Sequence, residues 1–154
     1  MKYFIRSVKY FFYLLVILAI IITALVLAGF VEADISKIFI NGYDSLWQIC
    51  LIMAVFAAIY PRFGFSTRTA HVYGSPEDVK PLVMRVMDLH GYRLEKEDAE
   101  SMSFVKRSVV SRLLKMWEDR ITISYDVAGL RLEGISKDLV RLVSGLEASQ
   151  REDV

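Results

Sequence analysis

The sequence is short of cysteine and of net charge, and each shortage excludes a class of protein. A single cysteine, Cys50, rules out a disulfide within the chain and the cysteine clusters of structural zinc sites. The 19 Lys and Arg nearly balance the 18 Asp and Glu, giving a net charge of +1. That value lacks the basic excess of a nucleic-acid-binding domain and the acidic excess of a disordered tail, so we expect no nucleic-acid partner.

Motifs that carry chemistry are also missing. The two histidines, His71 and His90, have no ligand-type residues at metal-binding spacing, and no serine lies in a G-x-S-x-G turn. Gly129 and Gly134 have the separation of a phosphate-binding loop, but Ile135 stands where that loop needs lysine. We therefore expect no catalytic residue, no metal and no cofactor, and we predict that the protein is not an enzyme.

Charge is absent from two long apolar stretches. Residues 10–31 form a neutral window of 22 residues, which as a helix is about 33 Å long and can cross a hydrocarbon core of about 30 Å. Residues 45–61 form a shorter neutral window, about 25 Å as a helix, at the lower limit for a crossing. A cleaved signal peptide is the alternative for the first stretch, although signal cores span about 7–15 residues. A buried soluble helix is the alternative for the second.

Basic residues near the two stretches predict an orientation. Three precede the first stretch, one lies between the two, and two follow the second: Lys2, Arg6, Lys9, Lys37, Arg62 and Arg68. The positive-inside rule then places both termini in the cytoplasm. We expect a multi-pass protein of the cell membrane, with a transmembrane hairpin over residues 1–65.

Small residues at four-residue spacing mark one side of each predicted span. Ala24 and Ala28 share a face of the first span, and Ala54 and Ala58 share a face of the second. Such faces let helices approach closely, so these four alanines are candidate packing positions. Beyond the lipid bilayer, the expected partner is another membrane protein or a second copy of the chain.

Residues 66–154 are polar enough to form a separate α+β domain on the cytoplasmic side. Ser75 and Pro76 predict a helix start, although Pro81 also allows a start at Asp78, and Ser136 is the expected cap of the last helix. The polar end over 148–154 is expected to fray. About five mostly antiparallel strands are predicted, over residues 67–73, 92–97, 101–107, 120–127 and 130–133.

The segment 108–117 between the two predicted hairpins is the main candidate for function. As a helix of about three turns it has an apolar face and a basic border, a pattern typical of helices in a membrane interface. Two alternatives are a helix that covers the sheet and a helix that fits a partner's groove. The candidate contact residues are Lys106, Arg107, Val109, Arg112, Leu113, Lys115, Met116 and Trp117.

Two functions follow from these features. The first is a non-enzymatic membrane protein, an accessory or scaffold subunit whose cytoplasmic domain contacts a protein or the membrane surface. The second is a membrane-tethered sensor of a ligand or lipid, with an apolar pocket of at least about 300 Å³. The residues expected to line that pocket are Tyr92, Phe104, Ile123 and Tyr125.

Overall fold

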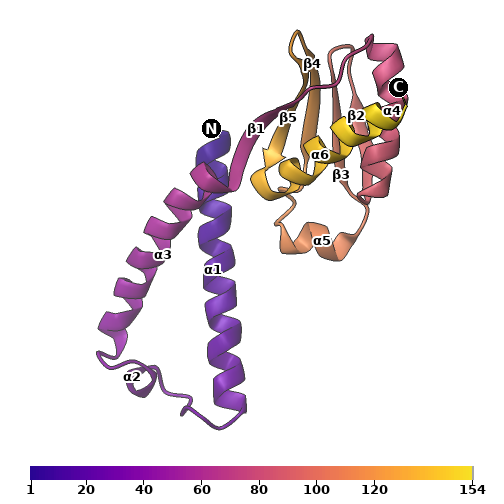
Figure 1. Ribbon diagram of the computed structural model, residues 1–154. Helices are drawn as coiled ribbons and strands as arrows, with labels where there is room; N and C mark the ends of the chain where they lie inside the picture. The colour runs from indigo at the N-terminus through magenta and orange to yellow at the C-terminus, as the bar shows by residue number, and fades with distance from the viewer. Residues whose placement is uncertain (154) are drawn as a thin grey trace. The chain divides into compact units, whose positions relative to one another are not determined.

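A computed structural model describes residues 1–153, apart from the side chain of Ile35 (Figure 1). The chain divides into two compact units, one over Met1–Arg62 and one that begins at Phe63. The fold is α+β, with six helices and one five-stranded antiparallel sheet in the described residues.

The first unit is helical. It contains α1 (Lys2–Leu27), the short α2 (Ile35–Ile38) and α3 (Tyr43–Gly64), whose last residues lead into the second unit. Helices α1 and α3 are both long and apolar enough to cross a membrane. The first helix begins eight residues before the predicted stretch and ends at Leu27 rather than at residue 31, because Gly29 adopts a left-handed conformation with φ of 75°.

Two contacts join α1 and α3 near one end of each helix. The Tyr3 hydroxyl donates to the Ala58 carbonyl, and the Tyr10 and Tyr60 rings lie 4.2 Å apart between centroids. Beyond this end most side chains are exposed, and no residue of α1 is buried. The alanines Ala24, Ala28, Ala54 and Ala58 are all exposed, whereas Ala57 is buried.

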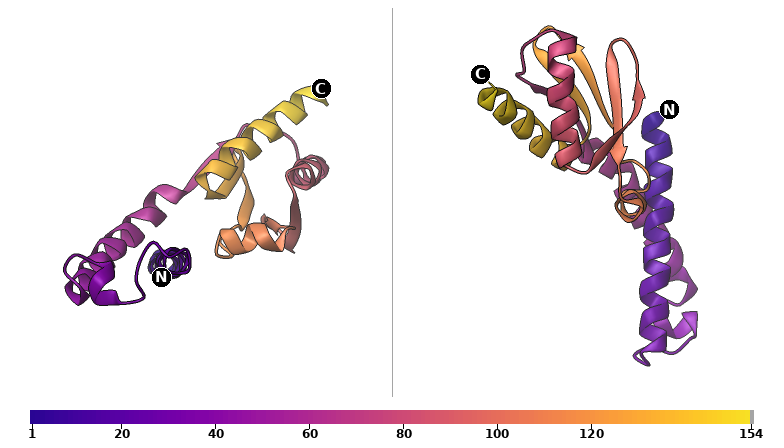
Figure 2. Two further views of the ribbon diagram at one scale, coloured as in Figure 1. Left: turned by 90° about the horizontal axis from the view of Figure 1, so that it is seen from below. Right: turned by 90° about the vertical axis from the view of Figure 1, so that its right-hand side faces the viewer.

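The second unit is built on the sheet, with strands in the order β1-β5-β4-β3-β2 and every neighbouring pair antiparallel. The strands are β1 (Phe65–Ala70), β2 (Tyr92–Glu97), β3 (Ser101–Lys106), β4 (Ile121–Asp126) and β5 (Gly129–Ile135). Helices α4 (Pro76–Leu89) and α6 (Ser136–Glu152) cover one face of this sheet, as the views in Figure 2 show.

Alternation along the strands divides the sheet into an apolar and a polar face. Met102 pairs with Ile123 and Phe104 with Ile121, and these four side chains are buried beneath the helices. The helices contribute a matching apolar stripe to the same core: Val79, Leu82, Val83, Val86, Met87, Leu139, Leu142 and Leu146. The opposite face carries hydroxyl side chains, for example where Ser103 pairs with Thr122.

Several predicted element boundaries are wrong. Strand β1 covers residues 65–70 rather than 67–73. Helix α4 begins at Pro76, as the Ser75 and Pro76 signal predicts, and not at the alternative start Asp78. The Ser75 side chain caps α4 by accepting from the Asp78 N–H at 3.2 Å, which confirms the predicted cap. Pro81 lies inside this helix, beyond its first turn, and is exposed.

The last helix also departs from prediction. Ser136 is its first residue rather than its cap, and its hydroxyl donates to the Phe63 carbonyl at 3.3 Å. The C-terminal part does not fray before Glu152, because polar side chains fix it to the segment after β1. Gln150 bonds both the N–H and the carbonyl of Tyr73, and Glu147 accepts from the His71 N–H at 2.9 Å.

Candidate membrane-contact surface

One end of the sheet gathers three features of the second unit. Phe65, the first residue of β1, pairs with Ile135, the last residue of β5. At the same end of the sheet β3 ends and β4 begins, since Phe104 pairs with Ile121. The segment that joins β3 to β4 contains α5 (Val109–Leu114), so α5, the start of α6 and the point where α3 leads into β1 share this end (Figure 1).

Helix α5 has two chemically distinct sides. Ser108 caps it, and positions 108, 111, 112 and 115 follow one another at helical spacing on the polar side. Positions 109, 110, 113 and 114 form the apolar side. This apolar side is exposed rather than packed on the sheet: Val109 is 72% exposed, Val110 66%, Leu113 54%, Leu114 65% and the following Trp117 55%.

The polar side of α5 is attached to the domain by ion pairs. Arg112 Nε lies 3.5 Å from the carboxylate of Asp119, a residue that is fully buried. The Asp119 carboxylate also accepts from the Lys106 backbone N–H at 2.7 Å. Lys115 forms an ion pair with Asp138 in the first turn of α6. The helix is therefore held with its charged side toward the domain.

Asp138 is the centre of the second of these attachments. The Tyr92 hydroxyl donates to its carboxylate at 2.9 Å, and Lys115 donates to the same oxygen. Burial raises the pKa of Asp138, but the hydrogen bond and charge of Lys115 outweigh burial, so its pKa lies below the ordinary value. Burial and the neighbouring Asp138 raise the pKa of Tyr92, so this hydroxyl remains a proton donor.

The four basic residues predicted to face an anionic surface all have partners within the domain. Besides Arg112 and Lys115, Arg107 forms an exposed ion pair with Asp88. Lys106 donates from Nζ to the His90 carbonyl at 2.7 Å and lies 4.0 Å above the Tyr92 ring centroid. The solvent-facing side of α5 is therefore mainly apolar.

The expected three-turn helix over 108–117 is wrong in extent. Helix α5 has six residues and ends at Leu114. Met116 and Trp117 follow with φ of 51° and 56°. This left-handed backbone conformation is strained for residues other than glycine. The Trp117 N–H donates to the Arg112 carbonyl at 2.8 Å, which ends the helix and leaves the indole exposed.

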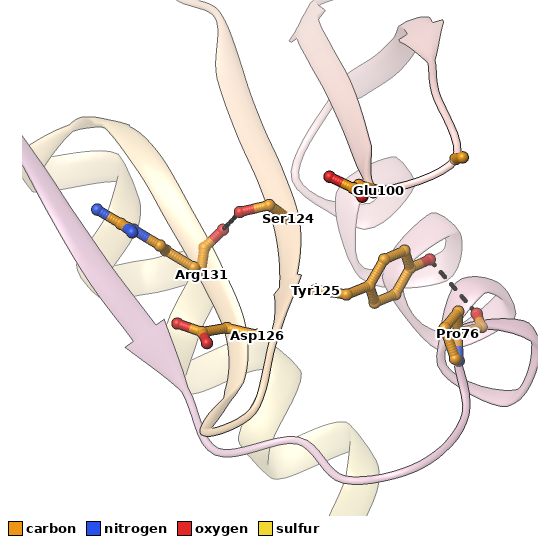
Figure 3. Close-up of a pocket in the computed structure, with 7 residues that line it drawn as sticks. Pro76, Glu100, Ser124, Tyr125, Asp126 and Arg131 are labelled. Atoms are coloured by element: carbon orange, nitrogen blue, oxygen red, sulfur yellow. Dashed lines mark hydrogen bonds between the residues drawn. The ribbon is translucent and has the colours of Figure 1, made fainter.

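The apolar pocket expected for a sensor does not form from its four predicted residues. Tyr92, Phe104 and Ile123 are at most 2% exposed and belong to the packed core. Tyr125 instead lines a pocket of about 590 Å³ at the opposite end of the sheet. Figure 3 shows the Tyr125 ring directed at Pro76, with its hydroxyl 3.4 Å from the Pro76 carbonyl, while Asp126 and Arg131 point the other way. These groups do not converge on one ligand.

The sequence does not reveal Asp119 and Asp138 as the residues that anchor α5. Asp119 lies two residues before the start of β4, where an acidic residue is usually solvated, and no spacing in the sequence marks it as buried. Asp138 fits the positive end of a helix in any fold, which conceals its role as the partner of Lys115. Among the described residues, no group of three His, Cys, Asp or Glu side chains is arranged to hold a metal ion.

Comparison with known proteins gives no relative, since no protein-family model, no curated protein and no solved structure matches this chain.

Proposed function

We propose that the protein is an integral membrane protein that crosses the bilayer twice, through α1 and α3, with both termini in the cytoplasm. The length and apolar composition of both helices support this proposal, as does the exposure of their side chains. Leaving a large apolar side chain in water instead of burying it costs roughly 1.5–3 kcal/mol of free energy. Helices that expose many of them need an apolar solvent, and lipid supplies one.

The α+β domain would lie against the same membrane through the apolar side of α5. The single observation that carries this proposal is the outward direction of Val109, Val110, Leu113, Leu114 and Trp117 at the end of the sheet where α3 leads into β1. No linker residue separates Gly64 of α3 from Phe65 of β1. A domain joined so directly to a span stays near the bilayer surface, within reach of an interface-seeking helix.

The bilayer fits this surface better than a partner's groove. The charged side of α5 is already paired inside the domain, so few charges remain to recognise a particular protein. Tryptophan is enriched at the membrane interface, where its ring is partly buried and its N–H stays hydrated. Inserting five partly exposed apolar side chains contributes several kcal/mol, on the order of 1 kcal/mol each.

In this position the domain acts without catalysis, as an accessory or scaffold subunit of a membrane assembly. Its membrane-side end is occupied by lipid, and the polar face of the sheet and the exposed alanines of α1 and α3 stay available to other subunits. Ala24, Ala28, Ala54 and Ala58 are the helix positions proposed for those contacts.

Fluorescence quenching tests the docking of α5. The chain has two tryptophans, so Trp47→Phe leaves Trp117 as the sole reporter. We expect brominated lipids in reconstituted vesicles to quench Trp117 strongly, and aqueous iodide to quench it weakly. The Val109→Ser, Leu113→Ser double variant in this background reverses that order, because it removes two apolar anchors from α5.

A matched control comes from the opposite end of the sheet. Val127 is fully exposed in the turn between β4 and β5, so Val127→Ser should leave Trp117 quenching unchanged. The proposal is wrong if iodide quenches Trp117 as freely as indole in water while brominated lipid has no effect. A Trp117 shielded from both quenchers, in a preparation that retains a second protein, would assign the surface to that protein instead.

A further inference from the structure

A small pocket beside α5 is lined by cationic side chains that the proposed function does not use. It has a volume of about 90 Å³ and is lined by His90, Tyr92, Lys106, Asp138, Arg141 and Leu142. Small-molecule sites start at about 300 Å³, so only a small group fits here. The pocket lies where β2 begins and β3 ends, the same end of the sheet as α5.

Positive charge exceeds negative charge around this pocket. Lys106 and Arg141 line it, and Lys115 and Arg112 lie next to it, against the carboxylates of Asp138 and Asp119. The two carboxylates form ion pairs with Lys115 and Arg112, so neither Lys106 nor Arg141 has an ion pair of its own among the described residues. Arg141 forms no hydrogen bond or ion pair within the described residues, although it lies close enough to Lys106 to repel it.

The Lys106 ammonium is fixed at the wall of the pocket. Its bond to the His90 carbonyl at 2.7 Å and its position 4.0 Å over the Tyr92 ring hold it in place, so little side-chain entropy remains to be lost on binding. Burial, together with the like charge of Lys115 and Arg141, lowers the pKa of Lys106. An anion in the pocket would relieve that repulsion.

We propose that this pocket binds a phosphate group, with Lys106 and Arg141 as its charged donors. Arginine offers a planar pair of N–H donors to phosphate oxygens, and lysine adds a compact point charge. A phospholipid headgroup is one source of the phosphate, and that source rests on the proposed membrane position of the domain. Free phosphate or a phosphorylated solute is the other source, which needs no membrane.

Calorimetric titration of inorganic phosphate into the full-length protein in detergent micelles tests the chemistry. We expect saturable binding, and we expect Arg141→Gln or Lys106→Met to weaken it by about tenfold to a hundredfold, since each removes one charge-assisted bond. Lys137→Gln is the matched control, because Lys137 is an exposed cation of the same helix that does not line the pocket. That variant should bind phosphate as the unaltered protein does.

Asp138→Asn separates binding from a merely structural effect. It removes the one carboxylate that lines the pocket, so phosphate should bind more tightly than to the unaltered protein even if the variant is less stable. The proposal is overturned if phosphate gives no binding heat, or if Arg141→Gln and Lys137→Gln bind it equally well.

The source of the phosphate is distinguished in nanodiscs. If a lipid headgroup occupies the pocket, inorganic phosphate should bind in detergent micelles but not in phosphatidylcholine nanodiscs, because the headgroup carries a phosphate. Equal binding in both assigns the pocket to a soluble phosphate. Trp117 quenching reports on the membrane position separately, so phosphate binding with a water-exposed Trp117 would sustain the pocket and refute the docking of α5.

Discussion

Single glycines show how closely the second unit is packed. Gly129, in the turn between β4 and β5, has φ of 128°, and a Cβ there would lie 2.3 Å from the Ala70 carbonyl oxygen. The obstacle is backbone of the neighbouring strand segment rather than a movable side chain. Gly91 also has a positive φ, 75°, but a Cβ there meets nothing within 4 Å.

Gly129→Ala should therefore destabilise the domain far more than Gly91→Ala. Both variants carry the strain of a left-handed alanine, about 1 kcal/mol, but only Gly129→Ala forces β1 away from β5, with an expected total loss of about 3 kcal/mol or more. Thermal unfolding of the detergent-solubilised protein compares the two. Equal losses of stability would mean that the strands separate easily at this turn.

At the scale of elements, α5 depends on the ion pair between Lys115 and Asp138. The pKa of Asp138 is lowered in the fold, so this contribution to stability is fully present above the ordinary carboxyl pKa of about 3.9. It is lost as the pH falls through the lower pKa of the folded state, where the carboxylate takes up a proton. The attachment of α5 should thus hold at neutral pH and weaken only in strong acid.

Amide hydrogen exchange over residues 109–117 measures this attachment. We expect protection to change little between pH 7 and about pH 4, after correction for the intrinsic exchange rate, and to fall below that range. Asp138→Asn should exchange faster at neutral pH and show no such acid step. If the variant keeps both the protection and the acid step, another group anchors α5.

The sequence predicts individual helices and strands but not which of them pair or pack with one another. Strict alternation from Ile121 predicted β4, and helical spacing around Val83 predicted α4, because both patterns are local. The strand order was not predictable, since β1 pairs with a strand some 60 residues later. The direction of α5 was not predictable either, because it depends on Asp119 and on Asp138, 23 positions beyond Lys115.

At the scale of the whole molecule, the proposed orientation predicts which segments face each side of the membrane. A Cys50→Ala background permits single-cysteine labelling with a membrane-impermeant maleimide. We expect Ala33→Cys, between α1 and α2, to react only from outside in vesicles of known orientation, and Ala148→Cys, in α6, only from inside. Both positions are exposed, so burial does not hide either thiol.

The unaltered protein is the control for that experiment. Its Cys50 lies within α3, in a stretch proposed to face lipid, and should resist the reagent from both sides. Labelling of Ala33→Cys and Ala148→Cys from the same side would contradict the crossing by α3, the apolar helix that lies between these two positions.

The pairing of β1 with β5 has a consequence for folding during synthesis. Phe65 and Ile135 are partners in the sheet yet lie 70 positions apart in the chain. At a synthesis rate of about 5–20 residues per second, roughly 4–14 s pass between the appearance of the two. During that interval β1, joined directly to an apolar helix, has an open edge and no neighbour. The nascent chain therefore completes its apolar helices before its sheet can close, and a chaperone that shields β1 would act in that window.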